Sequence, residues 1–123
     1  MILIFGGAYQ GKLEYAKKNF DIDTVCDCMQ ESCEPDFTTD AVCGIEAFTL
    51  QCVKEGVNPV EWFAAREGEW ADKVLIICDV SQGVVPIDPQ IRAFREANSR
   101  LMLYLAGKAK RVIRVFCGIG KDM

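Results

Sequence analysis

Apolar and polar residues follow one another along this chain in blocks that predict strands and helices in turn. Ile2-Leu3-Ile4-Phe5 is an apolar run of strand length, and residues 24–28 form a second, shorter one. The run at residues 73–80 is almost unbroken, which is typical of a strand buried on both faces in the middle of a parallel sheet. A last strand is predicted at residues 111–117, followed by a tail over residues 118–121.

Four segments between and after these runs have helical spacing or helix start signals. Asn58-Pro59 and Asp88-Pro89 each place a capping side chain before a proline at the first helical position. The long final helix would bury a stripe made of Ile91, Phe94, Asn98, Leu101 and Leu105. Helices are therefore predicted over residues 12–19, 40–53 (on Ala41, Ile45, Phe48 and Cys52, although Gly44 interrupts it), 58–71 and 88–108.

Because strands and helices alternate, the sequence predicts an α/β fold: a three-layer, P-loop NTPase-like domain with a mainly parallel central sheet. The polar segments at residues 31–40 and 81–87 are predicted loops. No repeat, low-complexity stretch or linker divides the chain, so residues 1–123 are predicted to form one nucleotide-binding domain.

Composition restricts the possible partners and chemistry. The net charge of −4 gives no electrostatic basis for binding nucleic acid, and no apolar run is long enough to cross a bilayer. The first residues do not resemble a signal peptide, so we expect a cytoplasmic protein. There is no histidine, which excludes an imidazole base, nucleophile or metal ligand.

Seven cysteines, an odd number, favour reduced thiols over a disulfide framework. Cys26, Cys28 and Cys33 are spaced closely enough to suggest a metal or redox site, but zinc sites usually have four ligands in spaced pairs. Cys78 and Cys117 lie in predicted strands, where cysteine commonly acts as a small buried hydrophobe. Structural or incidental thiols are therefore the favoured interpretation over a metal site.

The candidate chemistry is concentrated in a glycine loop between the first strand and the first helix. Residues Gly6-Gly7-Ala8-Tyr9-Gln10-Gly11-Lys12 satisfy G-x-x-x-x-G-K. In a strand–loop–helix context, the backbone N–H groups converge on phosphate oxygens, the helix N-terminus adds positive potential, and Lys12 reaches the terminal phosphates. The alternative is a glycine turn that only joins strand to helix. Leu13 stands where a P-loop enzyme has the Ser or Thr that binds magnesium.

Asp79 is the second candidate catalytic and metal-binding residue, beside Lys12. It follows the most buried predicted strand, at the edge where open α/β sheets bind ligands, and a carboxylate there can hold magnesium through water. A solvated aspartate at a strand end is the alternative interpretation.

Several segments together resemble the bifunctional adenosylcobinamide kinase/adenosylcobinamide-phosphate guanylyltransferase family. Residues 79–86 are similar to its N-E-V-G-x-G-[IV]-V-P segment, with Asp79 in the place of the glutamate. Residues 92–96 resemble R-R-F-R-D, residues 99–101 resemble G-R-L, and residues 109–120 resemble the last strand with its terminal G-I-G. Residues 1–12 resemble the I-L-V-T-G-G-A-R-S-G-K start, whereas residues 20–71 show no match.

The resemblance implies a cobalamin-biosynthesis phosphotransferase that takes ATP or GTP with Mg²⁺, acts on a corrinoid, and assembles as a trimer. It implies nucleotide contacts at Gly6, Gly7, Ala8, Tyr9, Gln10, Gly11, Lys12 and Leu13. The family's guanylyl transfer runs through a histidine, which this chain lacks.

Other departures also bear on activity. Leu13 replaces the metal-binding Ser, Tyr9 and Gln10 replace Arg-Ser, and Met102-Leu103 replace an Asn-Gln pair. For the retained Arg92, Arg95 and Arg100, a solvated or subunit-contact role is favoured over phosphate binding. Three functions stay open: a divergent adenosylcobinamide kinase-like enzyme, a nucleotide-binding regulatory or scaffold module without turnover, and a structural or partner-binding relic.

Overall fold

The computed structural model describes residues 1–30, 34–80 and 88–123, which form an α/β protein built on a six-stranded, mostly parallel sheet. The strand order is β2-β3-β4-β1-β5-β6, and only β6 runs antiparallel, against β5. The strands are β1 (Ile2–Gly6), β2 (Val25–Asp27), β3 (Ala41–Cys43), β4 (Val74–Cys78), β5 (Arg111–Phe116) and β6 (Ile119–Asp122). The helices are α1 (Lys12–Asn19), α2 (Ile45–Glu55), α3 (Pro59–Ala64), α4 (Glu67–Trp70) and α5 (Pro89–Lys108).

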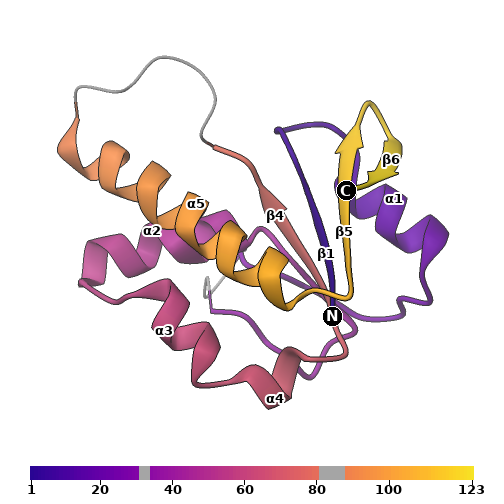
Figure 1. Ribbon diagram of the computed structural model, residues 1–123, viewed down its shortest axis with the longest axis horizontal. Helices are drawn as coiled ribbons and strands as arrows, with labels where there is room; N and C mark the ends of the chain where they lie inside the picture. The colour runs from indigo at the N-terminus through magenta and orange to yellow at the C-terminus, as the bar shows by residue number, and fades with distance from the viewer. Residues whose placement is uncertain (31–33, 81–87) are drawn as a thin grey trace.

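Helices cover both faces of the sheet (Figure 1). Alternate residues of β1 and β4 point to opposite faces. Leu3, Leu75 and Ile77 pack in one apolar cluster with α2, α3, α4 and α5, while Ile4 and Ile76 pack in a second cluster with α1. Every residue of β4 is buried, as its unbroken apolar run predicts, because β4 lies between β3 and β1 under helices on both faces.

The predicted helix starts at the two Asx-Pro signals are confirmed. The side chain of Asn58 accepts hydrogen bonds from the N–H groups of Val60 and Glu61, and Asp88 accepts from Gln90 and Ile91. Of the stripe predicted on α5, Asn98, Leu101 and Leu105 are buried, but Ile91 is 45% exposed. The first turns of α5 extend beyond the edge of the sheet, so they have no sheet surface to pack on (Figure 1).

The predicted helix over residues 40–53 is wrong in its first part. Ala41–Cys43 is a buried strand, β3, and the helix begins only at Ile45. Gly44 separates the two with φ 69°, and a Cβ there would lie 2.8 Å from the Met29 Cγ. Ala41 belongs to a buried strand and Ile45 to the buried face of a helix, so the four-residue spacing between them did not come from a single helix.

Three smaller differences concern helix and strand ends. The predicted helix over residues 58–71 is two short helices, α3 and α4, separated by Ala65 and Arg66. The Trp70 indole N–H donates to the Phe63 carbonyl across the break. The predicted tail over residues 118–121 is largely the strand β6. Cys117, expected inside a strand, is exposed in the turn between β5 and β6. The predicted loop at residues 81–87 lies outside the described residues.

Candidate functional site

The carboxyl ends of β1 and β4 form the point where the chain connections diverge. These strands are parallel neighbours, yet β1 continues toward α1 on one face and β4 continues toward α5 on the other. In open α/β sheets such a divergence opens a crevice that binds ligands. The glycine loop, residues 6–12, follows β1 directly into this crevice.

The glycine loop leaves α1 with a bare N-terminus. Gly11 is the N-cap in the left-handed region, φ 79°, and no side chain of the described residues caps the helix. The first hydrogen bond of the helix runs from the Tyr15 N–H to the Gly11 carbonyl at 2.9 Å. The N–H groups of Lys12, Leu13 and Glu14 come before it and have no acceptor within the helix. The helix therefore presents backbone donors and positive potential at the loop.

Lys12 lies over the loop that precedes it. Its Nζ donates to the Gly7 carbonyl at 2.7 Å. The ammonium therefore lies beside the backbone of the loop, where it can meet an anion bound by the loop. Gly6 must stay a glycine here, because a Cβ would lie 2.4 Å from the Val115 carbonyl oxygen.

A cavity of about 490 Å³ adjoins the loop and α1. Residues 8–14 form one side of it, so Ala8, Tyr9, Gln10, Gly11, Lys12 and Leu13 all line the cavity. Two carboxylates also line it, Asp27 at the end of β2 and Glu46 in the first turn of α2. Glu46 also accepts a hydrogen bond from the Cys78 N–H at 2.9 Å, which ties α2 to the end of β4.

Asp79 lies next to the loop in the backbone, but its side chain lines a different cavity. Its N–H donates to the Gly6 carbonyl at 2.8 Å, extending the β1–β4 pairing by one residue. Cys78 faces the loop cavity, and the alternation of side chains along a strand turns Asp79 to the other face. Asp79 there lines a cavity of about 250 Å³ with Phe5 and Ser99. Its predicted metal-binding role stays a prediction.

Leu13 has a packing role as well as its place on the cavity wall. It is half-buried and packs against the apolar cluster that contains Ile4 and Ile76. A leucine at this position thus supports α1 on the sheet, and it presents no oxygen to the cavity.

The pKa of the Cys78 thiol, at the end of β4, is shifted by burial and by the charged groups that surround it. Burial raises the pKa of Cys78, the Lys12 ammonium acts in the opposite direction, and Glu46 and Asp79 raise it further. Burial, with the neighbouring Asp27 and Glu46 carboxylates, raises the pKa of Cys43 to about 12. Both thiols are therefore protonated near neutral pH.

Asp27 and Glu46 are the cavity residues that the sequence analysis missed. Asp27 was recognisable, because it lies one residue before the end of the strand predicted at residues 24–28, and the carboxyl ends of parallel strands meet at one edge. Glu46 could not be recognised as a cavity residue, because a helix was predicted from residue 40. The strand β3, which ends at Cys43 and brings the start of α2 to this edge of the sheet, was therefore not expected. Among residues 1–30, 34–80 and 88–123, no group of three acidic, cysteine or histidine side chains is arranged to hold a metal ion.

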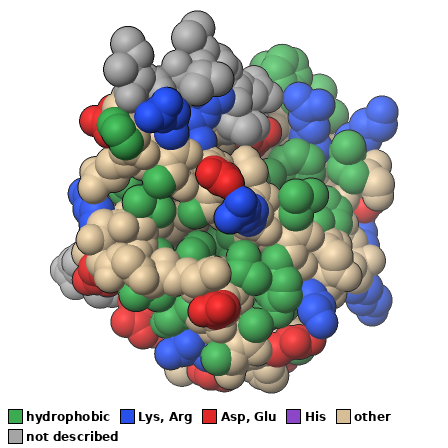
Figure 2. Space-filling model, turned by 60° about the vertical axis from the view of Figure 1, so that its left-hand side comes forward, with side chains coloured by type: hydrophobic (Ala, Val, Ile, Leu, Met, Phe, Trp, Pro, Cys, Tyr) green, Lys and Arg blue, Asp and Glu red, His purple; other side chains and the backbone are tan. Residues whose placement is uncertain are grey.

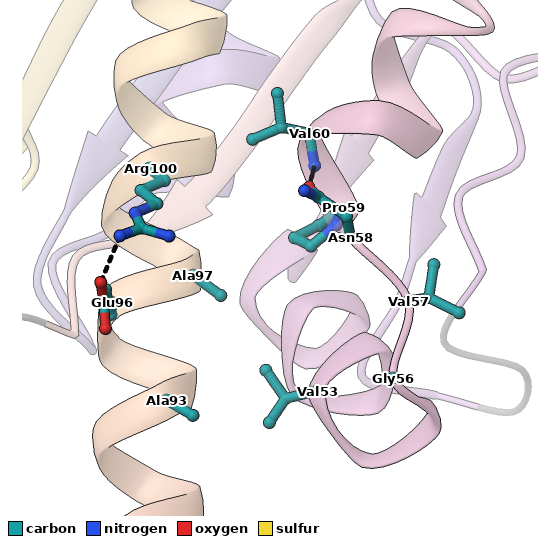
Figure 3. Close-up of a pocket in the computed structure, with 10 residues that line it drawn as sticks. All are labelled: Val53, Gly56, Val57, Asn58, Pro59, Val60, Ala93, Glu96, Ala97 and Arg100. Carbon is teal, nitrogen blue, oxygen red and sulfur yellow. Dashed lines mark hydrogen bonds and ion pairs between the residues drawn. The ribbon is translucent and has the colours of Figure 1, made fainter.

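A larger cavity, about 660 Å³, lies away from the glycine loop between α5 and the α2–α3 connection. Its walls are mostly aliphatic, and Figure 3 shows Val53, Pro59, Ala93 and Ala97 around it. The space-filling view of this side shows hydrophobic side chains in a hollow with charged groups nearby (Figure 2). Arg100, which also lines this cavity, is ion-paired with Glu96.

The three arginines shared with the resembled family lie on α5. Arg92 and Arg100 are exposed and Arg95 is half-buried, and none of the three lines the loop cavity. In the described part of the chain, no helix is both long enough and apolar enough to span a membrane.

No protein-family model matches the chain, and no curated protein matches it.

Proposed function

We propose that this protein binds the phosphate groups of a purine nucleotide at residues 6–12, in a P-loop NTPase-like fold. The observation that carries the proposal is the uncapped start of α1 behind a glycine loop with Lys12 over it, set where β1 and β4 diverge. A polyphosphate supplies what this arrangement lacks, namely anionic oxygens for backbone N–H groups and for an ammonium.

The order of the parts supports a phosphate site over a simple turn. A turn that only joins strand to helix needs neither a lysine folded back over it nor a cavity in front of it. Here Lys12 lies against the loop, at 2.7 Å from the Gly7 carbonyl, and the loop residues line about 490 Å³ of space. That space is in the usual range for a small-molecule site.

Magnesium fits this site only in part. Leu13 offers no hydroxyl and Asp79 faces the other cavity, but Asp27 and Glu46 line the loop cavity and would hold the ion through water beside the phosphates. The ion, when bound, neutralises phosphate charge. We therefore propose that nucleotide binding depends only weakly on Mg²⁺.

The second candidate function is phosphoryl transfer of the adenosylcobinamide kinase kind. It is favoured by the carboxylates that line the same cavity as Lys12, because phosphoryl transfer relies mainly on positioning and on charge neutralisation. The acceptor would be a corrinoid, as the motif resemblance implies, and histidine-dependent guanylyl transfer is excluded by composition. A binding module without turnover is the alternative, because the substitutions at Leu13 and Met102-Leu103 remove groups that the resembled family uses.

A binding screen tests the proposal. ATP, GTP, GDP and inorganic triphosphate are titrated by calorimetry and thermal shift, with and without Mg²⁺. At a ligand concentration one hundred times Kd, binding stabilises the protein by about 2.7 kcal/mol, which is about 10 °C in Tm for a domain of this size. A folded protein that none of these ligands stabilises would contradict the proposal and favour the structural relic.

Lys12→Met identifies the site, because it removes the ammonium and keeps most of the unbranched side chain. Loss of a charge-assisted contact should weaken triphosphate binding about tenfold to a hundredfold. Lys18→Met is the matched control, since Lys18 is an exposed lysine in the last turn of the same helix. A coupled assay with ATP, Mg²⁺ and adenosylcobinamide then distinguishes turnover from binding alone.

A further inference from the structure

Gln10, in the middle of the glycine loop, is bound to a part of the chain more than one hundred residues away. Its side-chain Oε1 accepts a hydrogen bond from the Cys117 N–H at 2.7 Å. Its backbone carbonyl accepts another from the Gly118 N–H at 2.8 Å. One loop residue thus receives both N–H groups of the turn between β5 and β6.

The turn is shaped to make this contact. Cys117 and Gly118 both have positive φ, 50° and 77°, as a two-residue hairpin turn of the I′ type requires. Gly11 approaches the same turn, because a Cβ on Gly11 would lie 3.5 Å from the Gly118 Cα. Farther along, the Tyr15 ring packs where a Gly120 Cβ would be, so the hairpin also contacts α1.

Tyr9, the residue before Gln10, is in a conformation that needs support from its surroundings. Tyr9 has φ 60° and a fully exposed side chain, and Gly11 has φ 79°. A non-glycine residue at positive φ is costly unless its surroundings fix it. Here the bonds from Gln10 to the β5–β6 turn supply that fixation from outside the loop.

We propose that Gln10 is a positioning residue, which holds the glycine loop in its phosphate-binding conformation by anchoring it to the β5–β6 turn. The inference rests on the proposed function and adds the hairpin to the site. A loop containing three glycines loses much conformational freedom when it closes on a ligand. An anchor that removes this freedom beforehand raises affinity without touching the phosphate.

Gln10→Met tests the anchor, because methionine keeps the length of the side chain and lacks the amide oxygen. The matched control is Gln51→Met on α2, which removes a side-chain hydrogen bond to Glu55 far from the loop. We expect Gln10→Met to raise the Kd for inorganic triphosphate about three- to tenfold and to leave the Tm of the ligand-free protein within a few degrees. Gln51→Met should leave the Kd unchanged.

The Cys117 amide gives a second readout, which a general loss of stability would not reproduce. In the wild type its NMR resonance should shift on triphosphate binding and exchange slowly with solvent. In Gln10→Met the amide should exchange quickly and lose the ligand-dependent shift. Wild-type binding with an unchanged Kd in Gln10→Met would overturn the anchor alone, whereas absence of wild-type binding would overturn the proposed function and this inference with it.

Discussion

Leu13 illustrates how one residue serves packing and limits chemistry. It is the first residue after Lys12, the position at which P-loop enzymes carry the hydroxyl that binds the magnesium ion. Its side chain instead packs against the cluster of Ile4 and Ile76 and lines the loop cavity. The packing gives a structural reason for the leucine that the sequence alone did not supply.

Replacing Leu13 by serine should make the protein less stable and make nucleotide binding depend on magnesium. We expect Leu13→Ser to lower the free energy of unfolding by about 1–3 kcal/mol, because a half-buried aliphatic side chain is lost. The new hydroxyl should make ATP affinity rise with Mg²⁺, measured by calorimetry at fixed ATP with and without the ion.

Leu13→Ala separates the two effects, because it loses the same packing without gaining an oxygen. Equal magnesium dependence in the alanine and serine variants would contradict this interpretation of residue 13. Asp79→Asn and Asp27→Asn, each introduced with Leu13→Ser, then show which carboxylate contributes. The resemblance predicts Asp79, whereas the cavity geometry favours Asp27.

At the level of single elements, local signals predicted the helix starts well. Asn58-Pro59 and Asp88-Pro89 begin α3 and α5, because the cap and the proline act through their own backbone neighbours. Elements that depend on distant partners were predicted less well. The three residues of β3 form a strand only because β2 and β4 flank them, and β6 depends on pairing with β5.

The same distinction separates the predictable and unpredictable parts of the site. The glycine loop, Lys12 and the strand that precedes them follow from a contiguous motif. The direction of Asp79 depends on strand alternation relative to the helices, and Glu46 depends on a strand that the helical spacing concealed. The contact of Gln10 with Cys117 joins opposite ends of the chain, and no pattern within either segment indicates it.

The cap at Asn58 provides a test at this scale. Asn58→Ala removes the acceptor for the N–H groups of Val60 and Glu61, at 2.9 and 3.3 Å. The free energy of unfolding should fall by about 1 kcal/mol, measured by urea denaturation. Asn58→Asp should retain most of the stability, since aspartate caps equally well. A loss as large as that of alanine would show that packing around α3, in the region drawn in Figure 3, matters more than the cap.

For the whole molecule, the most unusual feature is the number of thiols enclosed in it. Cys28, Cys43, Cys52 and Cys78 are all buried and free, and they are distributed over both faces of the sheet. Burial raises the pKa of Cys52 to about 11 and that of Cys43 to about 12, and it raises those of Cys28 and Cys78 as well. The folded protein therefore keeps protons that the unfolded chain releases at lower pH.

This difference predicts a loss of stability in alkali. Below about pH 9, where an exposed thiol ionises, both states are protonated and the thiols do not affect the pH dependence. Above it the unfolded chain binds fewer protons than the folded protein, so stability falls as pH rises. Cys28, Cys43 and Cys52 should each cost about 1.4 kcal/mol at pH 10, measured as the difference in urea unfolding free energy between pH 8 and pH 10 under reducing conditions.

Cys52→Ala tests the assignment of this loss to the buried thiols. The variant is less stable at every pH because a buried sulfur is removed, but it has one fewer group that titrates differently in the two states. Its loss between pH 8 and pH 10 should therefore be smaller than that of the wild type by about 1.4 kcal/mol. An identical loss in the two proteins would contradict the prediction for Cys52. The alkaline instability would then arise from groups other than this thiol, such as the buried thiols of Cys28 and Cys43.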